Sequence, residues 1–453
     1  MKIVIIGGVA AGAKAAAKIK RLRPEASVRV FTDDTNVSYS SCGLPYYIQG
    51  NFEDYRMLLV RSVEEFYQSG IRVYTQSRVE QIVPERRRII VNVHGKMTPV
   101  QYDKLIIATG ARPKIPDISG IDKFKNIFTL RRVEDGINIR NAMKEIKNVT
   151  IMGSGYIGME LLEAFVKNDL NVTVLEKNSH IMKVFDPEMS DLIKQKIENS
   201  SRNNFEIILN DKAQEIQGNN EGYVSKIITQ NGREIPTDMI IICTGVVPNS
   251  ELARDAGIEI GTTGAIKVNK LMGTSIENIY ACGDCAQKTH IVSGRDVWIP
   301  LGSTANKEGR CAAMNAGGVY CEFEGVLGST VSRCLNVTMS MTGLTEIQAQ
   351  EIGFSPVSVT IEKTDKVAYM PEVGDITLKI IADKVTGLLL GGQAVGSIGA
   401  DKRIYSLTSA LLAHLTVQEF SNNDLTYSPP YSPTIDPLLD AMQILCKKVS
   451  KAC

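Results

Sequence analysis

The feature that most constrains the fold is a unit of about 30 residues that occurs twice in the chain. Each copy has a short β-branched strand, a glycine turn, a helix and a second strand that ends in polar or acidic residues, and the copies span residues 2–34 and 149–177. This order of elements is typical of a βαβ unit, which binds a dinucleotide where the glycine turn opens the helix. Two such units predict an α/β chain with two Rossmann-like domains and two nucleotide sites.

The second unit has the complete fingerprint of a dinucleotide site. Gly153, Gly155 and Gly158 supply the tight turn, the close approach of the pyrophosphate and the close packing of the helix. Glu176 ends the next strand, about 20 residues further on, where a carboxylate bonds a ribose 2′-hydroxyl and repels a 2′-phosphate. We therefore expect NADH at this unit, although the adjacent Lys177 leaves room for NADPH.

The first unit is less regular. Its turn has Gly7, Gly8 and Gly12, but Val9 stands where the fingerprint has its middle glycine. At the end of its second strand the expected acidic position is Thr32, and Asp33 and Asp34 follow it. We expect a dinucleotide here too, and the residue that bonds its ribose stays open among these positions.

Charge, hydropathy and cysteine content exclude several classes of function. The chain has 51 basic and 50 acidic side chains, so no overall field favours nucleic acid or an anionic membrane. Apolar runs such as 239–242 stop at a glycine soon after, well short of the roughly 20 residues that cross a bilayer. Nine cysteines without dense spacing indicate a reducing compartment. We expect a soluble, cytoplasmic protein with no nucleic-acid or membrane partner.

Cys42 is the candidate redox residue. It lies in segment 38–47, which is polar and bounded by glycine and proline rather than apolar, and residues 43–52 hold no second cysteine. The alternative is a buried structural thiol. The pattern predicts a catalytic cycle that uses a single thiol.

Together the motifs resemble those of the pyridine nucleotide-disulfide oxidoreductase family over essentially the whole chain. Within the family they look like the single-cysteine group of coenzyme A-disulfide reductases, NAD(P)H persulfide reductases and NADH oxidases. The resemblance rests on the first glycine turn and on segments 38–47, 108–110, 153–158, 243–245, 280–284 and 428–432. It implies FAD on the first unit and the nicotinamide nucleotide on the second.

The resemblance also implies how the domains follow one another. The expected segments are an FAD-binding domain in two parts, 1–115 and 246–325, an NAD(P)H-binding domain, 116–245, and a C-terminal α+β dimerisation domain, 326–453. Strand-like runs at 357–361 and 376–381 fit the last domain. We expect a homodimer.

Individual cofactor contacts follow from the resemblance. It implies that Asp284 bonds the ribityl chain of FAD, that Tyr156 covers the nicotinamide side of the flavin, and that Glu160 lies near the nicotinamide. Beside the flavin and a helix N-terminus, the Cys42 thiol is expected to have a lowered pKa. Further implied cofactor contacts are Ser41, Val79, Ala108, Thr109, Gly110, Arg131, Ile157, Gly245, Gly283 and Tyr427.

The helix after the first turn has a cationic face. Lys14, Lys18 and Arg21 stand at i, i+4 and i+7, so they share one side of the helix. The alternative is an ordinary solvated face. In the similar reductases this helix and the positions of Ser38 and Ser41 contact coenzyme A, whose phosphates suit such a strip.

Two tyrosines match residues that such relatives bring from the partner subunit toward the cysteine. They are Tyr369 and Tyr427. Tyr427 is thus an expected contact of both the cofactor and the substrate. A lysine that some relatives have beyond the Pro-Pro-Tyr motif is Ile435 here, which puts coenzyme A specificity in question.

The expected activity is the flavin-dependent reduction of coenzyme A disulfide, coenzyme A persulfide or polysulfide by NAD(P)H through Cys42. Ala10 stands where peroxide-reducing relatives have a histidine, which disfavours a peroxidase. An NADH oxidase is the alternative, and an electron-transfer flavoprotein that serves a protein partner is another. Cys282 and Cys285 flank Asp284 without a second pair, so we expect no metal.

Overall fold

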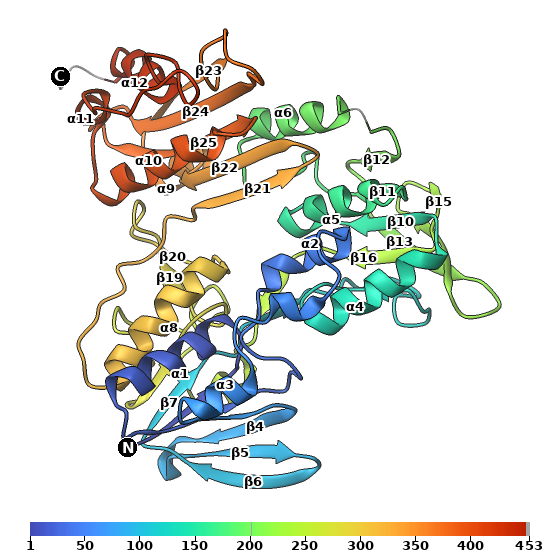
Figure 1. Cartoon of the computed structure of the whole chain (residues 1–453), viewed down its shortest axis with the longest axis vertical. Helices are drawn as coiled ribbons and strands as arrows, with labels where there is room; N and C mark the ends of the chain where they lie inside the picture. The colour runs from blue at the N-terminus through green and yellow to red at the C-terminus, as the bar shows by residue number, and fades with distance from the viewer. Residues whose placement is uncertain (201, 450–453) are drawn as a thin grey trace.

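The computed structural model describes residues 1–200 and 202–449 and has three lobes (Figure 1). The first lobe is built on a parallel five-stranded sheet in the order β18-β7-β1-β2-β3. Its central strands β1 and β7 are apolar and buried on both faces, as expected for a parallel sheet that is covered on each side. The strand bounds are β1 Lys2–Ile6, β2 Ser27–Phe31, β3 Ile71–Tyr74, β7 Lys104–Ile107 and β18 Ile279–Ala281.

Different elements pack on the two faces of this sheet. Helices α1 (Ala10–Leu22), α3 (Val63–Gln68) and α8 (Gly302–Ala316) share one apolar core with one face. The other face packs against a small antiparallel sheet of β4 (Ser77–Val83), β5 (Arg88–Val93) and β6 (Lys96–Gln101). The glycine turn between β1 and α1 therefore lies at the carboxyl edge of the parallel sheet, where nucleotides bind in such folds.

The second lobe repeats this design. Its parallel sheet has the order β12-β11-β10-β16-β9, and the helix α5 (Tyr156–Lys167) follows β10 as α1 follows β1. Two short strands that pair antiparallel, β8 (Ala111–Pro113) and β17 (Val246–Pro248), connect the first two lobes. The remaining strand bounds are β9 Ile127–Phe128, β10 Asn148–Met152, β11 Asn171–Leu175, β12 Phe205–Ile208, β13 Ala213–Gly218, β14 Val224–Thr229, β15 Glu234–Pro236 and β16 Met239–Ile242.

The third lobe is an antiparallel five-stranded sheet with helices on it, in the order β21-β22-β25-β24-β23. The helices α10, α11 and α12 share its main apolar core. The strand bounds are β21 Thr330–Cys334, β22 Val337–Gly343, β23 Pro356–Thr364, β24 Asp375–Asp383 and β25 Leu389–Gly396. The other bounds are α2 Leu44–Gln49, α4 Val133–Ala142, α6 Pro187–Glu198, α7 Glu251–Asp255, α9 Glu346–Ile352, α10 Ala400–Leu412, α11 Val417–Ser421, α12 Pro437–Cys446, β19 Lys288–Thr289 and β20 Asp296–Val297.

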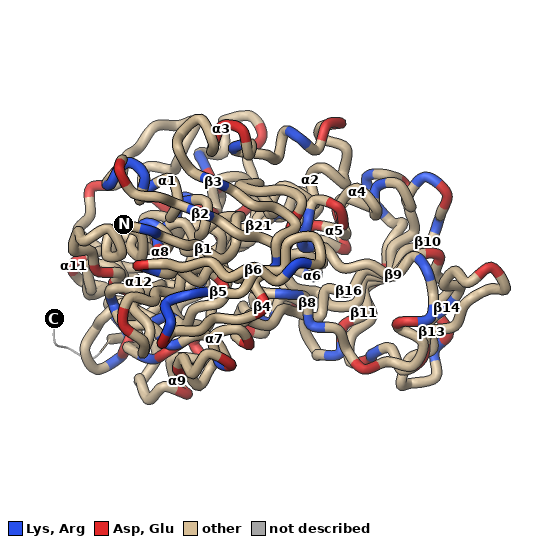
Figure 2. Tube along the Cα trace, turned by 90° about the horizontal axis from the view of Figure 1, so that it is seen from below, with Lys and Arg blue, Asp and Glu red and all other residues tan. Residues whose placement is uncertain are grey.

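The predicted fold class is confirmed, because two Rossmann-like lobes are followed by an α+β lobe. The domain bounds remain predictions, and residues 450–453 of the predicted last domain lie outside the described residues. Basic and acidic residues are interspersed along the chain trace, as Figure 2 shows. Among the described residues, no helix is both long and apolar enough to span a membrane.

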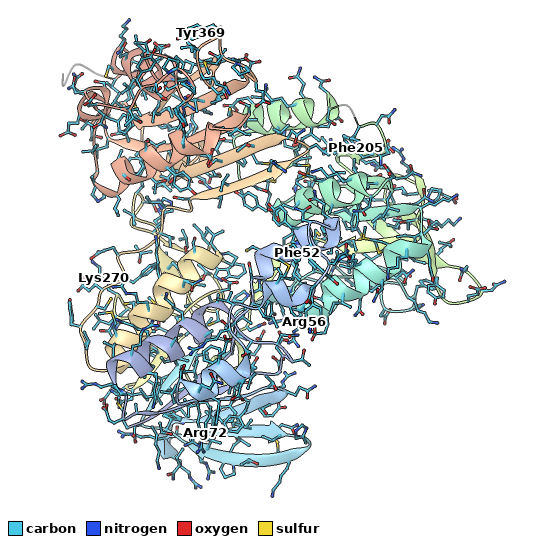
Figure 3. The ribbon with its side chains drawn as sticks, viewed as in Figure 1. Phe52, Arg56, Arg72, Phe205, Lys270 and Tyr369 are labelled. Atoms are coloured by element: carbon cyan, nitrogen blue, oxygen red, sulfur yellow. The ribbon has the colours of Figure 1, made fainter. Side chains whose placement is uncertain are left out.

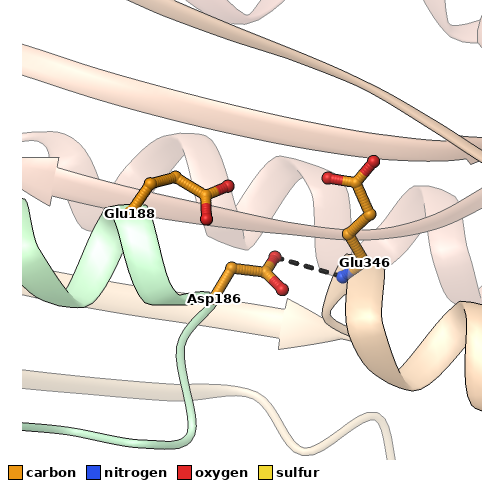
Figure 4. A group of neighbouring side chains, drawn as sticks. All are labelled: Asp186, Glu188 and Glu346. Atoms are coloured by element: carbon orange, nitrogen blue, oxygen red, sulfur yellow. Dashed lines mark hydrogen bonds between the residues drawn. The ribbon is translucent and has the colours of Figure 1, made fainter. Parts of the chain in front are cut away.

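A buried cation joins the second and third lobes. Lys379 of β24 is 2% exposed, and its Nζ lies 2.9 Å from Asp186 and 2.8 Å from Glu346, and also bonds Glu188. Figure 4 shows these three carboxylates converging from the start of α6 and from α9. Burial alone would lower the pKa of Lys379, but the hydrogen bonds to the three carboxylates raise it above its ordinary value. The acidic cluster, which has the spacing of a cation site, is thus neutralised by an ammonium group.

Replacement of this cation should destabilise the contact between the lobes. We expect Lys379→Met to lower the free energy of unfolding by roughly 3 kcal/mol, because the carboxylates lose their counter-ion. Lys363→Met is the control, since the Nζ of Lys363 lies 2.8 Å from Asp440 on a half-exposed surface and its loss should change stability by less than about 1 kcal/mol. Urea unfolding followed by circular dichroism measures both. Equal effects of the two variants would contradict the interpretation.

Candidate active site

A cavity of about 1940 Å³ has walls from all three lobes. This exceeds the roughly 300–1,000 Å³ of a site for one drug-sized ligand, so the cavity has room for more than one. Every predicted cofactor residue lies on its wall except five. The five are Gly12, Gly153, Gly158, Glu176 and Tyr427.

The two glycine turns have the same steric requirement. A Cβ on Gly7, at φ +103°, would lie 2.1 Å from the carbonyl oxygen of Ala108, and one on Gly153, at φ +106°, would lie 2.5 Å from that of Cys243. A Cβ on Gly12 or on Gly158 would meet the carbonyl of the first glycine of its own turn at 1.9 Å or 2.2 Å. Three of these glycines do not line the cavity but allow the helix, the strand and the turn to approach closely: Gly12, Gly153 and Gly158.

Asp284 supplies the clearest sign of a ligand. Its Oδ2 lies 2.9 Å from Nη2 of Arg131, whereas its Oδ1 is buried beside the cavity without a partner. A buried carboxylate oxygen is normally hydrogen-bonded, so a hydroxyl donor from a ligand is expected at this place. The ribityl chain of FAD has such hydroxyls, and the residues present fit the predicted cofactor.

The structure also separates the candidates for the adenosine ribose of FAD. The Asp34 side chain is buried and accepts from the Tyr39 hydroxyl at 2.8 Å and from the backbone N–H of Asn36 at 3.0 Å. The Asp33 side chain is 48% exposed, lines the cavity, and lies 2.8 Å from Nη2 of Arg132. Of these two carboxylates, Asp33 is the more exposed to a ligand, and its contact with the ribose stays a prediction.

A buried ion pair lies behind the Asp284 loop, and the sequence analysis missed it. The backbone N–H of Gly283 donates to Glu308 of α8 at 2.6 Å, and Nζ of Lys288 lies 3.3 Å from the other oxygen of that carboxylate. Trp298 donates its indole N–H to the Asp284 carbonyl at 2.8 Å. These partners come from separate parts of the chain and have no shared motif, so nothing in the sequence indicated them.

Cys42 lies on the cavity wall, in the short 3-10 turn Ser41–Gly43 that precedes α2. Burial by the surrounding protein raises the pKa of its thiol, and the charges of Glu160 and Asp284 raise it further, while the Ser41 hydrogen bond and Arg131 lower it. The protein groups alone therefore raise the pKa of the thiol, largely through burial and two carboxylates that are distant in sequence. The expected lowering of the pKa concerned a thiol beside bound flavin and a helix N-terminus, and it stays a prediction.

Two predicted residues form the nicotinamide side of the wall. Tyr156 and Glu160 lie on α5, one turn apart. Burial raises the pKa of the Glu160 carboxyl to about 7, the Ser332 hydroxyl lowers it by hydrogen bonding, and the neighbouring Glu163 raises it. This side of the cavity therefore has an acid that titrates near neutral pH.

Glu176 lies beside the second glycine turn, at the end of β11, but its carboxylate already has protein donors. One oxygen accepts from the backbone N–H of Ser154 at 2.9 Å and from its hydroxyl at 2.7 Å. The other accepts from the backbone N–H of Asn178 at 2.9 Å and from its side-chain amide. These donors hold the Glu176 side chain beside the second glycine turn, where an acidic group disfavours a nucleotide with a 2′-phosphate.

Only part of the cationic strip on α1 borders the cavity. Lys14 and Arg21 lie on the cavity wall, whereas Lys18 does not, so the cavity supports the predicted substrate contact for the first two and the contact of Lys18 stays a prediction. Ser38 and Ser41 also line the cavity. Arg61 and Lys307 add positive charge to the wall, and the sequence analysis missed both because they lie far from α1 in the chain.

Tyr369 and Tyr427 do not line the cavity of their own chain. Their exposed fractions are 75% and 48%. Figure 3 places Tyr369 at the end of the third lobe that is remote from the first lobe. A role for either residue at the cysteine would therefore require a second subunit.

The chain belongs to the pyridine nucleotide-disulphide oxidoreductase family. The family model matches residues 1–309, and the model of the family's dimerisation domain matches residues 334–438. This membership confirms the prediction of a flavin-dependent NAD(P)H oxidoreductase.

Several relatives are similar over nearly the whole chain. An NAD(P)H sulfur oxidoreductase (CoA-dependent) from Pyrococcus furiosus is 37% identical over 98% of this chain and 99% of its own length. A coenzyme A disulfide reductase from Staphylococcus aureus is 31% identical over 95% of this chain and 96% of its own. The solved structure of an NAD-dependent persulfide reductase from A. fulgidus is 34% identical, has a TM-score of 0.95, and matches 99% of this chain and 83% of that one.

The charge at Glu176 should set the choice of nucleotide. We expect the wild type to prefer NADH and Glu176→Gln to narrow the ratio of kcat/KM for NADH over NADPH by about tenfold, since the variant keeps the size of the side chain but removes the repulsion of a 2′-phosphate. Steady-state kinetics with both nucleotides measures the ratio.

The neighbouring Lys177, which is exposed, offers a control of opposite sign. Lys177→Gln removes a positive charge from the same place and should widen the preference for NADH. A wild type that prefers NADPH, or a ratio that neither variant changes, would show that this position does not select the nucleotide.

Proposed function

We propose that this chain is a cytoplasmic NAD(P)H-dependent reductase of coenzyme A disulfide and of coenzyme A persulfide or polysulfide, with FAD as cofactor and Cys42 as its one redox thiol. The observation that supports this most is the place of Cys42. It lies on the wall of one cavity together with the flavin-side Asp284, the nicotinamide-side Glu160, and Lys14 and Arg21 of α1. The relatives named for coenzyme A-dependent sulfur reduction and for coenzyme A disulfide reduction support the same substrate class.

The chemistry assigned to Cys42 follows from thiol–disulfide exchange. When bound, FAD supplies the relay of an electron pair from the nicotinamide to sulfur. The Cys42 thiolate attacks one sulfur of R–S–S–R or R–S–SH, the S–S bond breaks, and one fragment leaves as a thiolate or as hydrosulfide that takes up a proton. Cys42 then holds the other sulfur in a mixed disulfide or persulfide, and reduction by the electron pair frees that fragment and restores the thiolate.

The protein groups around Cys42 divide the tasks of this cycle. Arg131 partly neutralises Asp284, and Ser41 donates to the Cys42 sulfur, and both effects lower the pKa of the thiol against the influence of burial. Lys14 and Arg21 place positive charge on the wall of the same cavity, where a phosphorylated substrate would be held. The proposed assembly is a homodimer in which the partner's Tyr369 and the partner's Tyr427 lie toward the cysteine. The proposed domains are the four segments given above, 1–115, 116–245, 246–325 and 326–453.

Reduction of oxygen is the second candidate function. A relative named NADH oxidase from Methanocaldococcus jannaschii is 31% identical over 99% of this chain. The solved structure of a water-forming NADH oxidase from Lactobacillus brevis bound to NADH is 25% identical, with a TM-score of 0.94 over 99% of both chains.

Turnover with a panel of acceptors tests the proposal. Cys42→Ser should keep bound FAD but lower reduction of coenzyme A disulfide and persulfide by roughly 100-fold or more, because the fold does not need the thiol and the exchange does. The panel adds inorganic polysulfide and oxygen, and stopped-flow spectra of the wild type should have a thiolate-to-flavin charge-transfer band. Full sulfur reduction by Cys42→Ser would refute the mechanism, and faster wild-type turnover with oxygen than with any sulfur acceptor would favour the oxidase.

The cationic wall of the cavity gives a separate test of the substrate. Lys14→Gln together with Arg21→Gln should raise KM for the coenzyme A acceptors by roughly tenfold or more, since a charge-assisted bond to phosphate contributes about 1.5–3 kcal/mol. KM for inorganic polysulfide should change little, and added salt should weaken wild-type binding of coenzyme A acceptors.

Lys18→Gln is the matched control, because Lys18 is on the same helix but off the cavity wall. Its KM values should stay near those of the wild type. If Lys18→Gln raises KM as much as the double variant does, or if the double variant leaves KM unchanged, the wall charges do not bind phosphate.

A further inference from the structure

The first strand of the third lobe, β21, lies against the helix that forms the nicotinamide side of the cavity. The hydroxyls of Tyr156 on α5 and Thr330 on β21 are hydrogen-bonded at 2.5 Å. One helical turn further on, the Ser332 hydroxyl donates to Oε1 of Glu160 at 3.1 Å. A third contact follows at Glu163, whose Oε2 accepts from the backbone N–H of Leu335 at 2.9 Å.

The spacing of these contacts follows from the geometry of the two elements. Tyr156, Glu160 and Glu163 stand at i, i+4 and i+7 and so share one face of α5. Thr330 and Ser332 stand two apart on a strand and so project from the same face of β21. The two faces therefore meet in register along the length of the contact, and Ser332 is only 6% exposed.

Two of the residues held in this way, Tyr156 and Glu160, line the cavity, and the residues that hold them belong to another lobe. We propose that Thr330 and Ser332 are positioning residues for hydride transfer: Ser332 orients the Glu160 carboxylate toward the nicotinamide amide, and Thr330 fixes Tyr156 across the place that the nicotinamide must enter. This proposal rests on the proposed function for the identity of the site.

The two positioning residues should act in opposite directions on nucleotide binding. An ionised Glu160 accepts from the nicotinamide amide, and the Ser332 hydroxyl favours the ionised form. The titratable groups near Glu160 are Glu163 on its own helix, Cys42 on the cavity wall, Tyr46 of α2, which packs against α5, and Cys334 of β21. Arg333 of β21 lies 3.4 Å from Glu163. Loss of the Ser332 hydroxyl therefore raises the pKa of Glu160 from about 7, so the carboxyl is more protonated at neutral pH and the nucleotide binds more weakly.

Thr330 has the reverse effect. Tyr156 must leave its hydrogen bond to Thr330 before the nicotinamide can occupy the space that the ring covers, so that bond opposes binding. Thr330→Val keeps the shape of the side chain and removes the bond. Since a hydrogen bond contributes about 0.5–1.5 kcal/mol, the affinity for the nucleotide should rise by roughly 2- to 10-fold.

The test measures nucleotide binding apart from turnover. The dissociation constant of NAD⁺ for the FAD-loaded enzyme is determined by calorimetry between pH 6 and pH 9, and the rate of flavin reduction by NADH is followed without any sulfur acceptor. Ser332→Ala should weaken NAD⁺ roughly 3- to 10-fold at pH 7 and move the pH profile upward, with recovery at pH 9. Ser332→Thr should restore the wild-type profile, and Thr330→Val should tighten NAD⁺ without moving the profile.

Ser190→Ala is the control for loss of a buried hydroxyl, because Ser190 bonds the Ile181 carbonyl within the second lobe and lies off the cavity wall. It should leave both measurements unchanged. The proposal is overturned if Ser332→Ala keeps the wild-type pH profile, or if Ser332→Ala and Thr330→Val change affinity in the same direction. Because no acceptor takes part, failure of the proposed sulfur chemistry would leave this result intact, and the two failures can be told apart.

Discussion

In both nucleotide-binding lobes, a glycine at the end of the first strand lies against the backbone carbonyl that follows another strand of the same sheet. A Cβ at Gly7 or Gly153 would approach that carbonyl to 2.1 Å or 2.5 Å, a distance that no side chain tolerates. This contact sets where each helix begins and how close the backbone of the turn comes to a pyrophosphate. The places of Tyr156 and Glu160 follow from it, because both lie on α5, the helix that the second turn opens.

The third lobe completes the site that the two glycine turns begin. Lys379 joins it to α6 through three carboxylates, and β21 joins it to α5 through Thr330, Ser332 and Leu335. Both junctions are polar and largely buried, and such contacts depend strongly on distance and direction. They therefore specify one arrangement of the second and third lobes more narrowly than apolar packing alone would.

The sequence predicted the parts of the structure that are local. Glycine spacing and β-branched strands indicated both βαβ units, and the polar segment around Cys42 indicated a thiol outside the core. The family resemblance added Asp284, Tyr156 and Glu160, which all lie on the cavity wall. Helical periodicity placed Lys14, Lys18 and Arg21 on one face of the helix. Only the fold shows that Lys14 and Arg21 line the cavity and that Lys18 does not.

Other features depend on residues that meet only after folding. Asp33 and Asp34 differ in their partners, because the Tyr39 hydroxyl donates to the buried Asp34 whereas the half-exposed Asp33 pairs with Arg132. The pair of Lys288 and Glu308 and the contacts of β21 join segments without any shared motif. Such pairings cannot be deduced from one sequence, because neither periodicity nor spacing relates their members.

The reactivity of Cys42 depends on the arrangement of all these parts. Glu160 comes from α5 of the second lobe, Asp284 follows β18 of the first lobe, Arg131 precedes α4, and each changes the pKa of the thiol. Ser332 of the third lobe bonds Glu160 and so acts on the same thiol from a further step away. The fraction of thiolate at one exposed cysteine is therefore a property of three lobes, and a shift of any one of them relative to the others would change it.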